Sequence, residues 1–163
     1  MFMAAFSLAF HGFMRVGELI VGSKNTRVHT IGVSNIKLFE DKLEVFILSS
    51  KTDQYGEGTT ISISSTQNRN LCPVILMSSY LKDRPSITGS LFCHFEETPL
   101  SKYQFSALLK KALLFLRIDQ SGFKSHSFRI GMATTCSLEG LSDQQIKLLG
   151  RWKSAAYTRY IRI

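Results

Sequence analysis

The chain ends in a basic stretch that also holds two tyrosines. From residue 147 onward there is no acidic residue, and the basic residues are Lys147, Arg151, Lys153, Arg159 and Arg162. Such a run of charge is usually a solvated surface. Nearby cations also favour the ionised form of a tyrosine, however, so Tyr157 or Tyr160 could attack a phosphate as a nucleophile.

Trp152, the only tryptophan of the chain, lies at the start of this stretch, just after Gly150 and Arg151. Most tryptophans fill a core, and that role alone would explain the residue. Its indole N–H is also a hydrogen-bond donor, which could bind a phosphate oxygen.

Two pairs of residues, each spaced three apart, carry charges that could also act on a phosphate. Arg15 and Glu18 would lie on one side of a helical turn, as would His126 and Arg129 at the start of another helix. The first pair can be an ordinary surface ion pair, and an isolated histidine is more often structural. A His-x-x-Arg pair beside a helix N-terminus points more strongly to function, because both cations and the helix dipole favour a phosphate there. Lys51, in a predicted loop, indicates little by itself.

These residue types share one chemical target, the pentacoordinate phosphorane of phosphoryl transfer. Arginines present fixed forks of donors to its oxygens. A lysine can protonate a leaving alkoxide, and a histidine can shuttle a proton. The sequence shows neither a carboxylate cluster for a metal nor a Gly-x-x-x-x-Gly-Lys-Ser/Thr loop for a nucleotide, so we expect no cofactor.

The elements that must position these residues predict an α+β domain that is mainly helical, with a small three-stranded antiparallel sheet. The strands are expected at Val28–Val33, Leu43–Leu48 and Thr59–Ile63, with a long hairpin loop between the last two. Helices are expected at residues 1–13, 15–19, 73–82, 101–116, 126–138, 142–150 and 155–163. In the helix over 101–116, the expected core stripe is Phe105, Leu108, Leu109, Ala112, Leu113 and Leu116.

The composition is that of a globular domain with a basic surface. Of the 163 residues, 44% are hydrophobic and 20% charged, which argues against a disordered chain. The net charge of +8 favours a polyanionic partner, nucleic acid first and an acidic membrane surface second. No segment is long enough to span a membrane. Three cysteines cannot close a disulfide framework and favour a reducing compartment. Because the chain opens inside a core helix, we expect that Met1 is not the natural start.

In their order along the chain, these residues resemble the catalytic domain of the tyrosine recombinases, the phage-integrase family. The resemblance runs from Phe6 to Ile163 and implies one catalytic domain over residues 1–163, without the family's N-terminal core-binding domain. The family signature is an arginine, a hairpin lysine, a His-x-x-Arg pair, a later histidine or tryptophan, and a tyrosine. The matching residues here are Arg15, Lys51, His126, Arg129, Trp152 and Tyr160. Glu18 resembles the acid that supports the first arginine.

At two positions of the family signature, this sequence offers two candidate residues. The family's usual Leu-Gly-His is Leu149-Gly150-Arg151 here, followed by Trp152, so either Arg151 or Trp152 could take the sixth catalytic role. Trp152 is preferred because tryptophan is the family's known alternative. Tyr157 competes with Tyr160 as nucleophile, since both share a helical face, but the Tyr-Ile-Arg context favours Tyr160.

The resemblance implies cleavage and rejoining of DNA strands through a 3′-phosphotyrosyl intermediate, without metal or ATP. It implies double-stranded DNA as partner, a tetramer on DNA for the full-length protein, and no membrane. The residues expected to contact DNA are Lys124, Lys147, Lys153, Arg159 and Arg162.

Several motifs are most similar to recombinases of Crypton and DIRS-type eukaryotic mobile elements, or to host genes derived from them. Such an origin would place the protein in the nucleus, and any other in the cytoplasm or nucleoid. Two other interpretations stay open: a domesticated DNA-binding module without activity, and an enzyme like the type IB topoisomerases.

Overall fold

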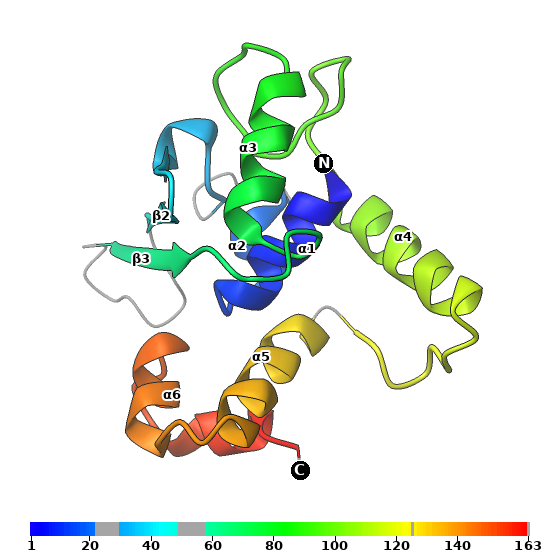
Figure 1. Ribbon diagram of the computed structural model, residues 1–163. Coiled ribbons are helices and arrows are strands. Elements are labelled where there is room, and N and C mark those ends of the chain that lie inside the picture. Colours follow the sequence, from blue (N-terminus) through cyan, green and yellow to red (C-terminus); the bar gives the residue numbers. More distant parts are fainter. Residues whose placement is uncertain (22–29, 49–57, 125, 163) are drawn as a thin grey trace.

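The computed structural model describes residues 1–21, 30–48, 58–124 and 126–162, and helices are its main regular structure (Figure 1). The α-helices are α1 (Phe2–His11), α2 (Val16–Leu19), α3 (Pro73–Asp83), α4 (Lys102–Phe115), α5 (Ser127–Leu138) and α6 (Asp143–Leu149). Two short 3₁₀ helices are η2 (Val33–Asn35) and η3 (Ala155–Tyr160). The mainly helical α+β fold expected from the sequence is confirmed. Within the described residues, no helix is long and apolar enough to cross a bilayer.

The sheet has three antiparallel strands in the order β1 (Ile36–Leu38), β2 (Lys42–Ile47) and β3 (Thr59–Ser64). In the central strand, Leu43, Val45 and Ile47 are buried and alternate with more accessible residues. This period of two is what a strand with one face on a core requires. The second and third predicted strands are therefore confirmed.

The first predicted strand, Val28–Val33, is wrong over the residues that the structure describes. Gly32 forms only an isolated bridge to Ser90, and Val33 begins η2. The side chain of Asn35 accepts a hydrogen bond of 2.7 Å from the Gly32 N–H and so stabilises a turn. The first strand of the sheet starts at Ile36.

Local sequence signals set several helix ends. Ser142 and Gln145 form a capping box at the start of α6, and Ser101 and Gln104 form another at the start of α4. Pro73 lies in the first turn of α3, where its missing N–H costs nothing.

α4 projects away from the rest of the molecule (Figure 1), and its predicted core stripe is only partly right. Phe105 and Leu113 are buried, whereas Ala112 and Leu116 are exposed. The buried end is fixed by aromatic packing, because the Phe105 ring lies 4.8 Å from that of Phe6 on α1 and 5.6 Å from that of Phe128 on α5. Beyond this contact the helix leaves the core.

Two clusters of buried side chains form the interior. The larger one joins α1, α2, α3 and the sheet, and its fully buried members include Leu8, Met14, Leu43, Met77 and Phe92. The smaller one joins α5, α6 and η3, and consists of Phe13, Ala133, Cys136, Ile146, Trp152 and Tyr157. Phe13 was expected to continue the first helix. That helix ends at His11 instead, and the chain turns Phe13 into the second cluster.

Candidate functional site

Arg15 and Glu18 lie in one tight turn at the start of α2, as their spacing predicts. Glu18 is buried and accepts two hydrogen bonds from Arg15: one from the backbone N–H to Oε2 (2.9 Å) and one from Nη1 to Oε1 (3.0 Å). This arrangement is more than a surface ion pair, because the carboxylate is enclosed. The Arg15 side chain is 24% exposed, so it remains accessible to a ligand.

Arg151 reaches the same carboxylate from the end of α6. Its Nη2 donates to Glu18 Oε2 at 3.0 Å and its Nη1 to Oε1 at 3.3 Å, which gives a two-pronged contact. The guanidinium also donates to the Phe13 carbonyl at 3.4 Å. Arg151 therefore holds Glu18 in place.

Arg129 is a fully buried cation at the junction of the two cores. It projects from α5, and its exposed fraction is 0%. Its Nη1 donates to the Phe13 carbonyl and its Nη2 to the Gly150 carbonyl, while Nε has no hydrogen-bond partner. A buried cation without a paired carboxylate is costly, so such an arrangement points to a functional demand.

Two aromatic rings cover this guanidinium. The Arg129 Cζ lies 4.2 Å from the centroid of the Trp152 ring and 5.7 Å from that of Tyr160. The two rings are 5.1 Å apart, centroid to centroid. Both contacts are within the range of cation–π attraction. The structure therefore brings together the predicted arginine, tryptophan and tyrosine.

The electrostatics of the cluster favour an anion. Three guanidinium groups (Arg15, Arg129 and Arg151) surround one carboxylate (Glu18), an excess of two positive charges. Burial, with repulsion from Arg15 and Arg151, lowers the pKa of Arg129 to about 10. Burial acts to raise the pKa of Glu18, but Arg151 and the hydrogen bonds from Arg15 outweigh it and leave that pKa below its ordinary value.

The two tyrosines of η3 differ in their surroundings. Tyr157 is buried, and its ring lies 6.4 Å from that of Trp152. A hydrogen bond to Asp143, together with burial, raises the pKa of Tyr157 and so opposes its ionisation. Tyr160 is less buried and faces Arg129. The surroundings therefore favour Tyr160 over Tyr157 as a nucleophile.

The structure does not gather every predicted site residue. His126 is exposed at the N-cap of α5, one turn before the buried Arg129, so the two do not share one environment. Lys51 lies outside the described residues. Among the described residues, no group of three or more His, Cys, Asp or Glu side chains is placed to hold a metal.

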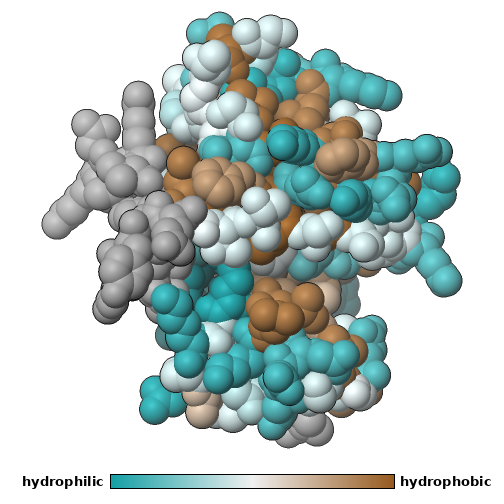
Figure 2. Space-filling model, turned by 90° about the vertical axis from the view of Figure 1, so that its left-hand side faces the viewer, coloured by the Kyte–Doolittle hydropathy of each residue, from teal (hydrophilic) through white to brown (hydrophobic). Residues whose placement is uncertain are grey.

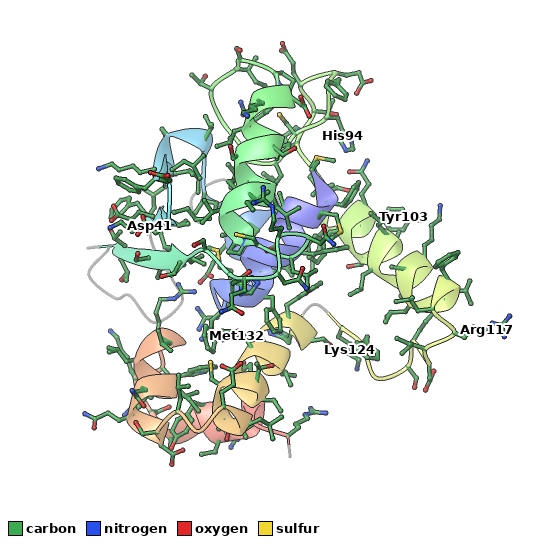
Figure 3. The ribbon with its side chains drawn as sticks, viewed as in Figure 1. Asp41, His94, Tyr103, Arg117, Lys124 and Met132 are labelled. Carbon is green, nitrogen blue, oxygen red and sulfur yellow. The ribbon has the colours of Figure 1, made fainter. Side chains whose placement is uncertain are left out.

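The residues predicted to contact DNA are mostly accessible. Lys124 is exposed on the segment that leads into α5 (Figure 3). Lys153, Arg159 and Arg162 are exposed near the C-terminus, whereas Lys147 is half-buried. These side chains are free to meet a polyanion.

A groove of about 270 Å³ between β3 and α6 ends at Arg151. Residues 59–63 line one side, and Leu148 and Leu149 line the other. Both leucines are exposed on α6. The face of the molecule in Figure 2 shows brown hydrophobic patches among the teal hydrophilic surface. Phe13 also lines the groove, so two residues that contact the cluster, Phe13 and Arg151, form part of its wall.

Sequence reasoning missed two contributors, Phe13 and Gly150. Both act through backbone carbonyls that accept from Arg129, and side-chain type carries no signal of that role. A Cβ on Gly150 would lie 1.6 Å from the Trp152 ring, so the close packing of these two residues requires glycine.

The chain is similar to recombinases in sequence and in fold. No protein-family model matches it. It is 27% identical over 124 residues to an integrase/recombinase XerD homologue of Selenomonas ruminantium, covering 72% of this chain and 36% of that protein. The similar solved structures include the XerA recombinase, with a TM-score of 0.72 and 20% identity, covering 98% of this chain and 51% of that one.

Two further structures contain DNA. The XerH site-specific recombinase bound to its difH substrate gives a TM-score of 0.66 at 13% identity, covering 99% of this chain and 42% of that one. The Tn1549 transposon integrase in complex with circular intermediate DNA gives 0.63 at 8% identity, covering 98% and 53%. The chain thus spans about half or less of each relative. The expected fold, that of the tyrosine recombinase catalytic domain, is confirmed, and the similarities support that family.

Proposed function

We propose that this chain is the catalytic domain of a tyrosine recombinase that cleaves and rejoins double-stranded DNA through Tyr160. The observation that carries the proposal is the packing of the Tyr160 and Trp152 rings against Arg129, inside a cluster with two uncompensated positive charges. A phosphodiester supplies the negative charge that this cluster lacks.

The reaction consists of two exchanges at one phosphorus. The Tyr160 hydroxyl oxygen attacks the phosphorus while the bond to the 5′ oxygen breaks, which leaves a 3′-phosphotyrosyl ester and a 5′ hydroxyl. By the resemblance to the family, His126 accepts the tyrosine proton and Lys51 protonates the leaving oxygen. The 5′ hydroxyl of another strand then attacks the ester and gives its proton to Lys51, while Tyr160 leaves and takes back its proton from His126. Each step replaces one phosphoester bond with another, so no ATP is needed.

The arginines have separate roles. Arg15 is the accessible guanidinium and meets the phosphate first. Arg129 has five N–H donors and gives two of them to carbonyls, so others remain for a phosphate oxygen. Because Arg129 is buried, the phosphate reaches these donors only when the Tyr160 ring moves away from it. Trp152, rather than Arg151, takes the sixth catalytic role, because the Arg151 side chain forms an ion pair with Glu18.

The DNA duplex is held mainly through its backbone. Lys124, Lys153, Arg159 and Arg162 are exposed and Lys147 half-buried, and contacts from such residues to phosphates make binding salt-sensitive. The groove between β3 and α6 leads a strand to Arg151 and the cluster.

Three finer statements belong to the same proposal. The full-length protein acts as a tetramer on DNA, as the resemblance to the family implies. Its origin is a Crypton or DIRS-type mobile element, or a host gene derived from one, which is supported by the motif around Trp152 and by the Tyr-Ile-Arg at the C-terminus. Such a protein acts in the nucleus.

The test is covalent capture. A pool of duplexes, each nicked beside a randomised region, is incubated with the protein, and denatured protein–DNA adducts are recovered and sequenced. We expect an adduct with wild type and with Tyr157→Phe but none with Tyr160→Phe. Mass spectrometry of the adduct should place the phosphate on Tyr160.

Other outcomes would favour the other interpretations. DNA retained in a gel shift without any adduct would indicate a binding module without activity. Relaxation of supercoiled plasmid without sequence preference would indicate an enzyme like the type IB topoisomerases.

A further inference from the structure

The helices that meet at the site end in an unusual way. α1 and α6 both close with a Schellman motif whose residue with positive φ is not glycine: Phe13 (φ 48°) and Arg151 (φ 58°). The hydrogen bonds of the motif are present in each, from Phe13 N to Phe10 O and Met14 N to Ala9 O in α1, and from Arg151 N to Leu148 O and Trp152 N to Lys147 O in α6. α4, which lies away from the site, closes in the same way at Arg117 (φ 56°).

Left-handed backbone is unfavourable for these side chains. At the end of α5 the same motif has a glycine, Gly140 (φ 83°), with no such cost. α1 offers a glycine too, Gly12, but places it one residue before the left-handed position. A strained position of this kind persists where the surroundings fix it. Of the four described non-glycine residues with positive φ, Phe13 and Arg151 lie at the site, whereas Glu97 and Arg117 do not.

The left-handed turn gives Phe13 two contacts with the site. Its carbonyl accepts hydrogen bonds from Arg129 Nη1 and from Arg151 Nη2. Its ring meets the Trp152 ring edge to face, with centroids 5.9 Å apart at 90°. The turn thus brings one residue against two of the arginines and the tryptophan.

We infer that Phe13 is a positioning residue: its ring keeps the Trp152 indole against the Arg129 guanidinium, while its carbonyl orients that guanidinium. The catalytic consequence rests on the proposed function, but the placement of Trp152 does not. A residue that only filled the core would stabilise the fold without setting the orientation of Trp152.

The only tryptophan of the chain is the probe. Trp152 is 9% exposed, so its fluorescence should resist quenching by acrylamide. Phe13→Leu keeps an apolar side chain and removes the aromatic edge. The matched control is Phe105→Leu, which makes the same change at a fully buried phenylalanine of the other core.

We expect Phe13→Leu to raise the acrylamide quenching constant of Trp152 at least twofold and Phe105→Leu to leave it unchanged. Equal quenching in the two variants would overturn the inference. If Phe13→Leu shows no cooperative unfolding transition, Phe13→Met replaces it, because the flexible methionine side chain can adapt to the space left by the ring and also lacks the aromatic edge.

A second arm measures catalysis with a duplex recovered by covalent capture. Phe13→Leu should slow adduct formation at saturating DNA at least tenfold, with less than a twofold change in the dissociation constant, and Phe105→Leu should change neither. An unchanged rate for Phe13→Leu would contradict the catalytic consequence. If wild type itself forms no adduct, the proposed function fails, and the quenching result alone decides whether Phe13 positions Trp152.

Discussion

Glu18 is the residue that keeps two arginines of the site side by side. Removing its charge by Glu18→Gln leaves Arg15 and Arg151 without their carboxylate, and we expect a loss of about 2 to 4 kcal/mol in the free energy of unfolding at pH 7. The pKa of Glu18 is lowered in the folded state from its ordinary 4.5, so its stabilising contribution is present above that pH and is lost as the pH falls through the folded value.

The measurement is urea denaturation of wild type and Glu18→Gln at pH 7 and at pH 3. The difference between the two proteins should shrink at the lower pH. Glu44→Gln, which breaks the more exposed pair with Lys42, should cause a smaller loss at pH 7. A difference for Glu18→Gln that stayed constant over this range would contradict the role of its charge.

Arg151 and Trp152 compete for one catalytic role, and their contacts separate them. Because Arg151 holds Glu18 and Trp152 faces Arg129, Arg151→Ala should lower stability, whereas Trp152→Phe should act mainly on the reaction. We expect Trp152→Phe to slow covalent adduct formation by roughly 100-fold, as the loss of one transition-state donor does. Single-turnover adduct assays and thermal unfolding of both variants would test this, and a stable Arg151→Ala with the larger rate loss would reverse the assignment.

For single residues, the sequence predicts which close neighbours touch better than it predicts how deeply a side chain is buried. A spacing of three residues correctly predicts that Arg15 and Glu18 touch. The same spacing does not make His126 and Arg129 alike, because one ends up exposed at a helix N-cap and the other fully buried. Burial depends on which other helices pack on α5, and a local pattern does not contain that information.

In α4, the helical pattern of apolar residues predicts more buried side chains than the structure has. Phe105 is fully buried at its start, while Phe115 at its end is 87% exposed. We therefore expect Phe105→Ala to lower the free energy of unfolding by about 3 to 5 kcal/mol and Phe115→Ser to change it by less than about 0.5 kcal/mol. Chemical denaturation measures both. A comparable loss at Phe115 would show that the end of α4 is packed.

The positions of β2 and of the starts of α4 and α6 depend on residues close together in the sequence, so the sequence predicts them well. The alternation in β2 and the capping boxes at Ser101 and Ser142 involve neighbours in sequence, and the strand and both helix starts are where they predict. The end of α1 is different. Gly12 would ordinarily take the left-handed position after a helix, but Phe13 takes it, because its ring and carbonyl are held by residues more than a hundred positions away.

In the whole molecule, the site lies where the two cores meet. Arg129 lies on α5, and its guanidinium donates hydrogen bonds to two carbonyls: that of Phe13, after α1, and that of Gly150, at the end of α6. Glu18 and Arg151 make a second link between the same two halves. Any ligand that neutralises the cluster therefore strengthens the contact between the cores, and its binding should be visible in the stability of the whole chain.

Sulfate, as a mimic of a DNA phosphate, tests this link without any DNA sequence. Because the cluster has an excess of two positive charges, sulfate bound there should stabilise the protein by about 1 kcal/mol, or raise its Tm by roughly 3 °C, beyond the effect of chloride at the same ionic strength. Arg15→Gln removes the accessible guanidinium and should abolish this extra rise. Lys110→Gln changes the net charge equally at an exposed position on α4 and should retain it. If both variants kept the rise, sulfate would be acting on the general surface charge and not on the arginine cluster that joins the cores.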